Sequence, residues 1–158
     1  MEDVVINIKG YEVIISACDV ERVKAHGWYK NTSKKFKGGP YFAYRSPGDG
    51  KNISLHRFIM NCPPDMYVDH INCNTLDNRR SNLRICNRAE NSKNRRKNKN
   101  STSGYKGVFW DKNFLEWAAY ICVNRKRIYL GRFNNPEKAY EAYVAASQKY
   151  HGEFGCIG

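Results

Sequence analysis

The centre of this chain carries the sequence DHINCNTLDNRRSNLRICNRAEN, residues 69–91, which predicts both a local fold and a chemistry. It places a carboxylate beside an imidazole, at Asp69 and His70, and then two amides at Asn82 and Asn91. A carboxylate, an imidazole and amides can together hold one hard metal ion, activate a water molecule and cut a phosphodiester bond. The stretch therefore predicts a compact hydrolytic site.

The order of residues in this stretch also predicts its secondary structure. A strand is expected to end at residues 69–70, and a second short strand is expected over residues 82–86. Asn87 followed by Glu90 is typical of a capped helix N-terminus, which places Asn91 in the first or second turn. The intervening loop is rich in residues that form turns by bonding to their own backbone, namely Asn72, Asn74, Asp77, Asn78 and Ser81.

This segment resembles the HNH nucleases, in particular the His-Asn-Asn variety of phage homing endonucleases, which have a ββα-metal fold. The resemblance implies that Asp69 and Asn91 bind a metal ion and that His70 is the general base. It also implies that Asn82 braces the loop and fixes His70. The upstream segment LHRFIM, residues 55–60, resembles the apolar segment that precedes the motif in these nucleases.

The third motif position favours a particular kind of metal ion. It is Asn91 here, where the wider family has a histidine. A neutral amide oxygen together with one carboxylate favours a single magnesium or manganese ion over zinc. A zinc site formed by Cys62, Cys73 and Cys86 is the minor alternative, because their spacing lacks the usual paired ligands.

Each of these features also has a plainer explanation. An isolated Asp-His pair is usually a turn, and an Asn-rich loop is usually only a loop, but the ordered set favours a nuclease. His56 either approaches the scissile phosphate or is a structural imidazole at a helix start, and the second interpretation is preferred. Arg84 is expected on the same strand face as Asn82, where it either binds a phosphate or is solvated.

The charge of the chain points to a polyanionic partner. The formal net charge is +12 and the pI is about 9.5. Basic residues are concentrated in residues 55–100, where ten Lys and Arg face four Asp and Glu. Within the run KNRRKNK, residues 93–99, we expect Arg95, Arg96 and Lys97 to contact the DNA backbone; a solvated run is the alternative.

A second informative region covers residues 105–154. YKGVFW, EWAAYICV and KRIYLGRF predict three short strands, and Pro136 opens a helix that Gly152 ends. In the second strand, Trp117, Ala119, Ile121 and Val123 are expected to share one face. The helix carries an apolar stripe at Ala139, Ala142, Tyr143, Ala146 and Tyr150.

This region resembles the plant ethylene-response-factor DNA-binding domain of the AP-two type, a three-stranded antiparallel sheet packed on one helix. In that family the exposed face of the sheet enters the major groove. The positions that the resemblance carries over are Lys106, Phe109, Asp111, Arg127 and Tyr129, with Lys112 and Arg125 nearby. Family members often have Arg at the positions of Phe109 and Cys122, so their target sequence does not transfer. A purely structural sheet-helix module, with Trp110 and Trp117 in its core, is the alternative.

The first 54 residues are expected to support the nuclease hairpin, which alone is too small to bury an adequate core. Strands are predicted over residues 4–8 and 12–16, followed by a short helix capped by Asp19. A hairpin is predicted across residues 46–51. The loop lysines Lys34, Lys35 and Lys37 either touch DNA or are solvated, and solvation is the preferred interpretation.

The sequence thus predicts an α+β chain with four parts: a supporting segment (1–54), an HNH module (55–98), a linker (99–104) and an AP-two-like domain (105–156). Six single cysteines, with no signal peptide or long apolar run, predict reduced thiols in the cytoplasm of a phage-infected or viral host cell. The predicted function is a site-specific endonuclease of homing type that acts as a monomer on double-stranded DNA. The alternative is a DNA-binding regulator whose nuclease module is inactive.

Overall fold

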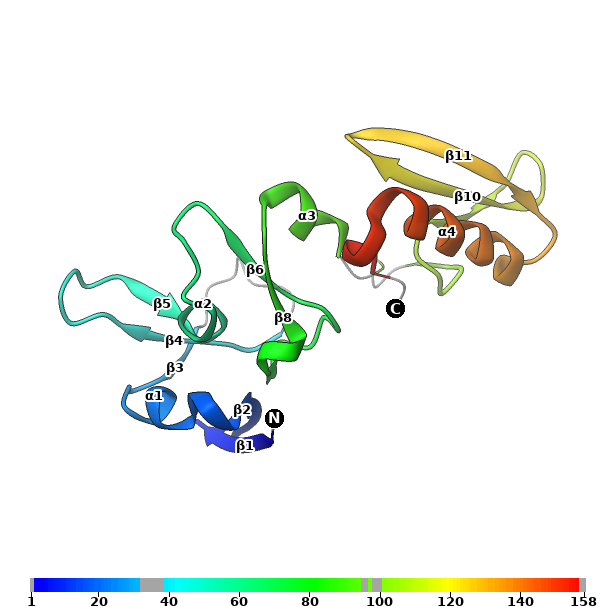
Figure 1. Cartoon of the computed structure of the whole chain (residues 1–158). Coiled ribbons are helices and arrows are strands. Elements are labelled where there is room, and N and C mark those ends of the chain that lie inside the picture. Colours follow the sequence, from blue (N-terminus) through cyan, green and yellow to red (C-terminus); the bar gives the residue numbers. More distant parts are fainter. Residues whose placement is uncertain (1, 32–38, 95–96, 98–100, 157–158) are drawn as a thin grey trace. The chain divides into compact units, whose positions relative to one another are not determined.

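The computed structural model describes residues 2–31, 39–94, 97 and 101–156. In this part the chain forms short helices and small sheets, so the predicted α+β class is confirmed (Figure 1). The chain divides into two compact units, Met1–Asn91 and Ser92–Gly158. The contacts predicted for Arg95 and Arg96, and for the loop with Lys34, Lys35 and Lys37, lie outside the described residues.

The first unit begins with a hairpin of β1 (Asp3–Ile8) and β2 (Tyr11–Ser16). Lys9 and Gly10 form its turn with φ angles of 52° and 83°, the left-handed conformation that suits a two-residue hairpin. A third strand, β7 (Asp77–Asn78), comes from the polar loop of the predicted site and pairs with β2 in parallel. The N-terminal hairpin therefore holds part of that loop.

The predicted short helix with Asp19 at its N-cap position is confirmed, but Asp19 does not cap it through its side chain. Asp19 precedes α1 (Val20–Lys24), but its side chain makes no capping hydrogen bond. Its carboxylate is buried and instead accepts hydrogen bonds from Arg22 and Arg80. A buried carboxylate needs a charged partner more than a helix end needs a cap, and Arg80 supplies one from the far side of the loop.

A second small sheet and a helix complete the support of the site. The sheet has the order β3 (Tyr29–Asn31), β4 (Tyr41–Arg45), β5 (Asn52–Ser54), and β5 leads directly into α2 (Leu55–Met60). The hairpin predicted across residues 46–51 is therefore confirmed. One hydrophobic core joins the hairpins, α1 and α2 through buried side chains that include Val13, Ile15, Val23, Phe42, Leu55 and Ile59.

The predicted ββα arrangement consists of β6 (Tyr67–His70), β8 (Leu83–Cys86) and α3 (Arg88–Lys93). β6 and β8 pair antiparallel, with Asp69 opposite Arg84 and His70 opposite Leu83. Asn82 was expected in the second strand but ends the short 3-10 helix η2 (Arg80–Asn82) that precedes it. The strand begins one residue later because Asn82 uses its side chain to close the loop.

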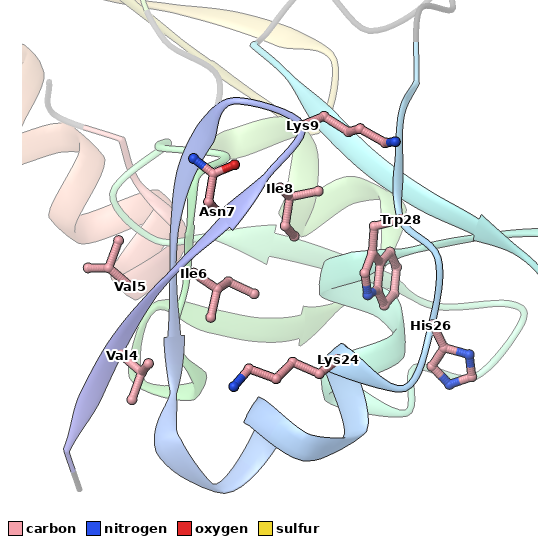
Figure 2. A pocket seen from close by; sticks show the side chains of 9 residues that line it. All are labelled: Val4, Val5, Ile6, Asn7, Ile8, Lys9, Lys24, His26 and Trp28. Atoms are coloured by element: carbon pink, nitrogen blue, oxygen red, sulfur yellow. The ribbon is translucent and has the colours of Figure 1, made fainter.

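A hollow of about 560 Å³ lies beside the N-terminal hairpin (Figure 2). It is lined by β1 and by Lys24, His26 and Trp28. Trp28 is buried and donates its indole N–H to the carbonyl of Val23 at 2.6 Å. None of the predicted catalytic or metal-binding residues lines this hollow, so it belongs to the supporting structure.

The second unit contains three antiparallel strands in the order β11 (Lys126–Phe133), β10 (Glu116–Val123), β9 (Val108–Asp111). One long helix, α4 (Pro136–His151), packs against β10 and β11 (Figure 1). The predicted division of β10 into two faces is confirmed, because Ala119 and Ile121 are buried under α4. The short helix η3 (Gly152–Phe154) follows α4.

Helix α4 has the predicted ends, but its buried face differs near the C-terminus. The side chain of Asn135 accepts a hydrogen bond from the Lys138 amide, and Gly152 ends the helix with a φ of 55°. Tyr150 was expected in the apolar stripe but is exposed, whereas Ser147 and His151 are buried. The predicted burial of Trp110 is also wrong, since that side chain is 41% exposed. Within the described part of the chain, no helix has the length and apolar character needed to cross a membrane.

Candidate active site and nucleic-acid face

Asp69 and Arg84 form a largely buried ion pair across the β6–β8 hairpin. The guanidinium of Arg84 donates to Asp69 Oδ2 through Nε at 3.0 Å and through Nη2 at 2.7 Å. Only 12% of the Arg84 side chain and 9% of the Asp69 side chain are exposed. Arg84 was expected either to bind a phosphate or to be solvated; it is instead largely buried and pairs with the candidate metal ligand Asp69.

His70 follows Asp69 at the end of β6 and is also buried. Its Nε2 lies 3.2 Å from Oδ1 of Asn78. Burial lowers the pKa of His70, while the hydrogen bond to Asn78 and the negative charges of Asp69 and Asp77 partly oppose this shift. The imidazole is therefore neutral at neutral pH, which is the form that can accept a proton.

The His70 ring packs against His56, which in turn packs against Tyr41. The ring of His56, the second residue of α2, lies 5.3 Å from the His70 ring with an interplanar angle of 64°. Tyr41 of β4 packs edge-on against His56 at 5.6 Å. Burial, followed by electrostatic repulsion from His70 and Arg57, lowers the pKa of His56 to about 3. A neutral, packed imidazole matches the preferred structural interpretation of His56.

The lowered pKa of His56 predicts a loss of stability in mild acid. In the unfolded chain the imidazole has its ordinary pKa of 6.5, so protonation favours unfolding as the pH falls from 6.5 towards about 3. We expect the melting temperature to fall between pH 7 and pH 5. His56→Leu should reduce the slope of the free energy of unfolding against pH by up to about 1.4 kcal/mol per pH unit. His70 acts in the same direction, so part of the slope should remain; an unchanged slope would contradict the assignment.

Asn82 closes the loop between β6 and β8. Its side chain accepts from the Asn72 amide at 3.0 Å and donates to Asn72 Oδ1 at 3.0 Å and to the Asp77 carbonyl at 2.7 Å. Its carbonyl also accepts from the amide of Ile71. These are the contacts expected of a bracing residue, whereas the hydrogen bond to His70 Nε2 comes from Asn78.

Asn78 was predicted only as a turn former, because the spacing of the residues along the chain does not indicate its contact with His70. Asp77, its neighbour, is buried and binds Arg79 through two hydrogen bonds of 2.7 and 2.6 Å. The guanidinium of Arg79 lowers the pKa of the Asp77 carboxyl. Arg79 also reaches Asp3 of β1 at 2.9 Å, so the loop is tied to the N-terminal hairpin.

Asn91 lies in the first turns of α3, as predicted. The capping box is confirmed: the Asn87 amide donates to Glu90 Oε2 at 2.8 Å, and the Glu90 amide donates to Asn87 Oδ1 at 2.9 Å. The Asn91 amide in turn donates to the Asn87 carbonyl at 3.0 Å. Asn87 thus fixes the start of the helix that carries the second candidate metal ligand.

The donor set fits a hard cation better than zinc. If Asp69 and Asn91 are the ligands, as the sequence predicts, they would offer one carboxylate and one amide oxygen, and such oxygens suit magnesium or manganese. Among the described residues, no group of three or more His, Cys, Asp or Glu side chains is placed to hold a metal ion. None of the six cysteines, all of which lie in the described part of the chain, forms a disulfide, and burial raises the pKa of Cys86 to about 11, which disfavours a thiolate ligand.

In the second unit, the sheet face opposite α4 carries exposed aromatic rings and arginines. Phe109 is 46% exposed and Tyr129 is 48% exposed. Tyr120 lies between them, 6.3 Å from the Phe109 ring and 5.3 Å from the Tyr129 ring. A shallow hollow of about 300 Å³ on this face is lined in part by Phe109, Tyr120 and Arg127.

Two arginines lie over the aromatic rings of this face. The Arg127 guanidinium is 5.3 Å from the centre of the Phe109 ring and 4.8 Å from that of Tyr120. Arg132 covers Phe114 at 3.5 Å and forms an ion pair with Asp111 at 3.3 Å. Because guanidinium groups already occupy these ring faces, the surface is better suited to reading groove edges than to stacking unpaired bases.

The remaining predicted DNA contacts of this unit divide into two groups. Lys112 and Arg125 are exposed in the turns that flank the sheet. The ammonium of Lys106 instead donates hydrogen bonds to the carbonyls of Lys93 at 3.0 Å and Cys156 at 3.2 Å. Lys97 is exposed and bonds to the Gly104 carbonyl. Lys106 therefore ties the chain ends of this unit together.

Family models match both regions of this geometry. Residues 61–93 match the HNH endonuclease family, and residues 103–153 match the AP2 domain. The chain carries an HNH endonuclease segment followed by an AP2 domain. Both predicted resemblances are therefore confirmed. The HNH segment contains Asp69, His70, Asn82 and Asn91, and the AP2 domain contains the whole aromatic and arginine face.

Two viral relatives support the assignment at a distance. An uncharacterised HNH endonuclease of Acanthamoeba polyphaga mimivirus is 29% identical over 154 residues, which cover 92% of this chain and 74% of that protein. Protein 3.8 of Escherichia phage T7 is 37% identical over 65 residues, 41% of this chain and 54% of that protein. The match thus spans about half the length of the phage protein. No solved structure matches the chain.

Proposed function

We propose that this protein is a site-specific DNA endonuclease, of homing type, that hydrolyses phosphodiester bonds with His70 as general base and one magnesium or manganese ion. The HNH segment would cut, and the AP2 domain would supply affinity for the target. We further propose that it acts as a monomer in the cytoplasm of a phage-infected or viral host cell.

The observation that carries the proposal is the environment of His70. The imidazole is buried at the end of β6, follows a carboxylate directly and is held by a buried amide. Such a ring is neutral and has a fixed orientation, which are the two properties that a general base requires. A histidine with only a structural role would not need to lie beside an acidic side chain in an HNH segment.

In the proposed reaction, His70 removes a proton from a water molecule as its oxygen attacks phosphorus. The bond from phosphorus to the 3′ oxygen breaks on the opposite side and this oxygen takes a proton from solvent, so the products would carry a 5′ phosphate and a 3′ hydroxyl. Asn82 maintains the loop that presents His70, through its contacts with Asn72 and Asp77. The role of these residues is to hold one geometry in which base, water and phosphate can align.

Asp69 and Asn91 would hold the metal ion. When bound, the ion would supply positive charge that stabilises the phosphorane-like transition state and the departing oxygen. Arg84 donates to Asp69 Oδ2 and so holds this carboxylate in place. The same ion pair competes for the charge of Asp69, and metal binding would have to loosen it.

The Asp69–Arg84 ion pair also favours the alternative function, a DNA-binding regulator with an inactive nuclease segment. In that protein the arginine would neutralise Asp69 permanently. The two functions differ in one simple respect. The nuclease would produce new DNA ends that depend on magnesium or manganese, whereas the regulator would bind DNA and leave it intact.

Mapping of DNA ends distinguishes these functions. The purified full chain would be incubated with host genomic DNA and magnesium, with manganese, or with EDTA, and all new ends would be sequenced. We expect ends that cluster at one or a few sites and that disappear in EDTA. Binding without any cleavage in either metal would overturn the nuclease proposal and leave the regulator.

Arg127 is expected to contribute to recognition of the target. Phe109 and Tyr120 hold its guanidinium over their rings on the exposed face, so little side-chain freedom is lost on binding. A two-pronged contact from arginine to guanine is worth about 1–3 kcal/mol of discrimination. Arg127→Ala should therefore reduce preference for the mapped site by about tenfold or more at one or two base pairs.

Lys126→Ala is the matched control, because Lys126 is exposed and precedes Arg127 on the same strand. This variant should weaken binding to the target duplex and to a scrambled duplex by the same factor. It should also flatten the dependence of the logarithm of the DNA-binding constant on the logarithm of the salt concentration, by about 0.9 for each phosphate that the variant no longer binds. Both variants would be measured over a salt series. Full site preference in Arg127→Ala would place recognition elsewhere in the chain.

A further inference from the structure

Asn78 lies where the N-terminal sheet meets the candidate base. It belongs to β7, which pairs in parallel with β2 through Ile14 opposite Asp77 and Ile15 opposite Asn78. The Ile14 amide also donates to the Leu76 carbonyl at 2.9 Å. Asn78 is 1% exposed. Its backbone is therefore fixed by a sheet that is formed largely by residues distant in the sequence from His70.

The two ends of the Asn78 side chain have different partners, which determines how the amide is oriented. Nδ2 donates to the Thr75 carbonyl at 3.0 Å. A carbonyl can only accept a hydrogen bond, so the NH₂ group has to face Thr75. The oxygen Oδ1 therefore faces His70 Nε2 at 3.2 Å.

This orientation decides which nitrogen of His70 carries the proton. Oδ1 of an amide has no hydrogen to donate, so the hydrogen bond forms only if Nε2 carries one. In a neutral imidazole the lone pair then resides on Nδ1. We propose that Asn78 is a positioning residue that holds His70 in the tautomer with its proton on Nε2 and its lone pair on Nδ1. This inference rests on the proposed function, in which His70 accepts a proton.

The N-terminal hairpin acquires a role from the same contacts. The loop that carries Asn78 is tied to it by the Arg79–Asp3 ion pair at 2.9 Å and by the hydrogen bond from the Arg80 amide to Ser16 Oγ at 3.0 Å. Arg80 also binds the buried Asp19 at 2.7 Å. These ties hold β7 against β2, and β7 in turn presents Asn78 to the imidazole.

A buried asparagine that merely satisfies its hydrogen bonds would also stabilise the fold. The structural and positioning roles predict different effects when Asn78 is replaced. If Asn78 is only structural, its replacement lowers the melting temperature, with or without His70. If Asn78 positions His70, its replacement lowers kcat only while His70 is present, and an oxygen acceptor at position 78 restores kcat.

Histidine ¹⁵N NMR of the full chain tests the tautomer directly, without any need for activity. Histidine-labelled protein at neutral pH would be compared with His70→Ala to assign the His70 signals. We expect the nitrogen shifts of a neutral ring protonated at Nε2. A ring protonated at Nδ1 would overturn the inference, whatever the protein does to DNA.

Cleavage kinetics test the consequence. Asn78→Leu should lower kcat by about tenfold or more, because a base in the wrong tautomer cannot accept the proton from the same side. DNA affinity should stay within about twofold. Asn78→Asp keeps an oxygen towards Nε2 and should recover most of the loss. Asn74→Leu is the control: it is an exposed asparagine of the same loop, and its side-chain oxygen accepts from the Leu76 amide.

The same substitution in a His70→Ala background completes the design. There, Asn78→Leu should cause no further loss of cleavage, because the group that it positions is gone. An equal loss with and without His70, or wild-type kcat in Asn78→Leu, would overturn the inference alone. A wild-type protein that cuts no DNA with either metal would overturn the proposed function, and the NMR result would still decide the tautomer. If Asn78→Leu does not fold, the NMR comparison of the wild type with His70→Ala still tests the tautomer.

Discussion

His70→Ala is expected to reduce the rate of DNA cleavage by about 100-fold or more, the usual scale for the loss of a positioned proton acceptor. His70 is buried and is held at Nε2 by Asn78, so the variant loses an imidazole that has a fixed place in the site. DNA affinity should change little, because one buried imidazole makes a minor share of the contacts to a duplex. Cleavage would be measured by single-turnover kinetics, and affinity by binding to the mapped site.

Chemical rescue separates the loss of a base from the loss of structure. Removal of the side chain leaves a space of imidazole size next to Asn78, so added imidazole should restore part of the rate in His70→Ala. The melting temperature of the variant provides the folding control. If the purified variant cleaves at the wild-type rate, His70 has no place in the mechanism.

Asp69→Asn is expected to abolish magnesium-dependent cleavage, a fall of about 100-fold or more, because this carboxylate carries the only negative charge of the proposed ligand pair. The amide keeps an oxygen that can accept from Arg84, so the buried guanidinium is not left without a polar neighbour. For this reason Asp69→Asn is a better probe than Asp69→Ala, which would leave that charge uncompensated. Asn91→Ala should weaken cleavage less, because it removes a neutral oxygen.

Arg84→Gln is the matched control for Asp69→Asn. It removes the positive charge, while its amide can still donate to the Asp69 carboxylate, so metal-dependent cleavage should persist and should need no more metal than the wild type. Both variants would be titrated with magnesium and manganese, and their melting temperatures compared. Full activity of the wild type in EDTA, or of Asp69→Asn in magnesium, would refute a metal site on Asp69.

Several features of the fold follow from neighbours along the chain and were therefore predictable. Asn87 and Glu90 are three residues apart, and they form the reciprocal capping bonds that this spacing allows. The alternation along residues 116–123 places Ala119 and Ile121 under α4. The end of β6 at His70 was predicted in the same way, from the turn formers that follow it.

Features that depend on distant partners were missed or misplaced. Asp19 looks like a helix cap in sequence, but its buried carboxylate pairs with the partly exposed guanidinium of Arg80, 61 residues away. Lys106 looks like a groove contact, but the carbonyls of Lys93 and Cys156 attract its ammonium. Tyr150 fits the apolar stripe of its helix, yet it is exposed, and the neighbouring His151 is buried instead.

Sequence alone therefore determined the chemical groups of the candidate site, their order and the local elements that carry them. Tertiary structure alone decided which of these groups meet. The pairing of β7 with β2 brings Asn78 to His70, and the pairing of β6 with β8 brings Arg84 to Asp69. Spacing cannot predict such contacts, because the free energy of a buried polar group depends on whatever partner the packed chain places within hydrogen-bonding distance.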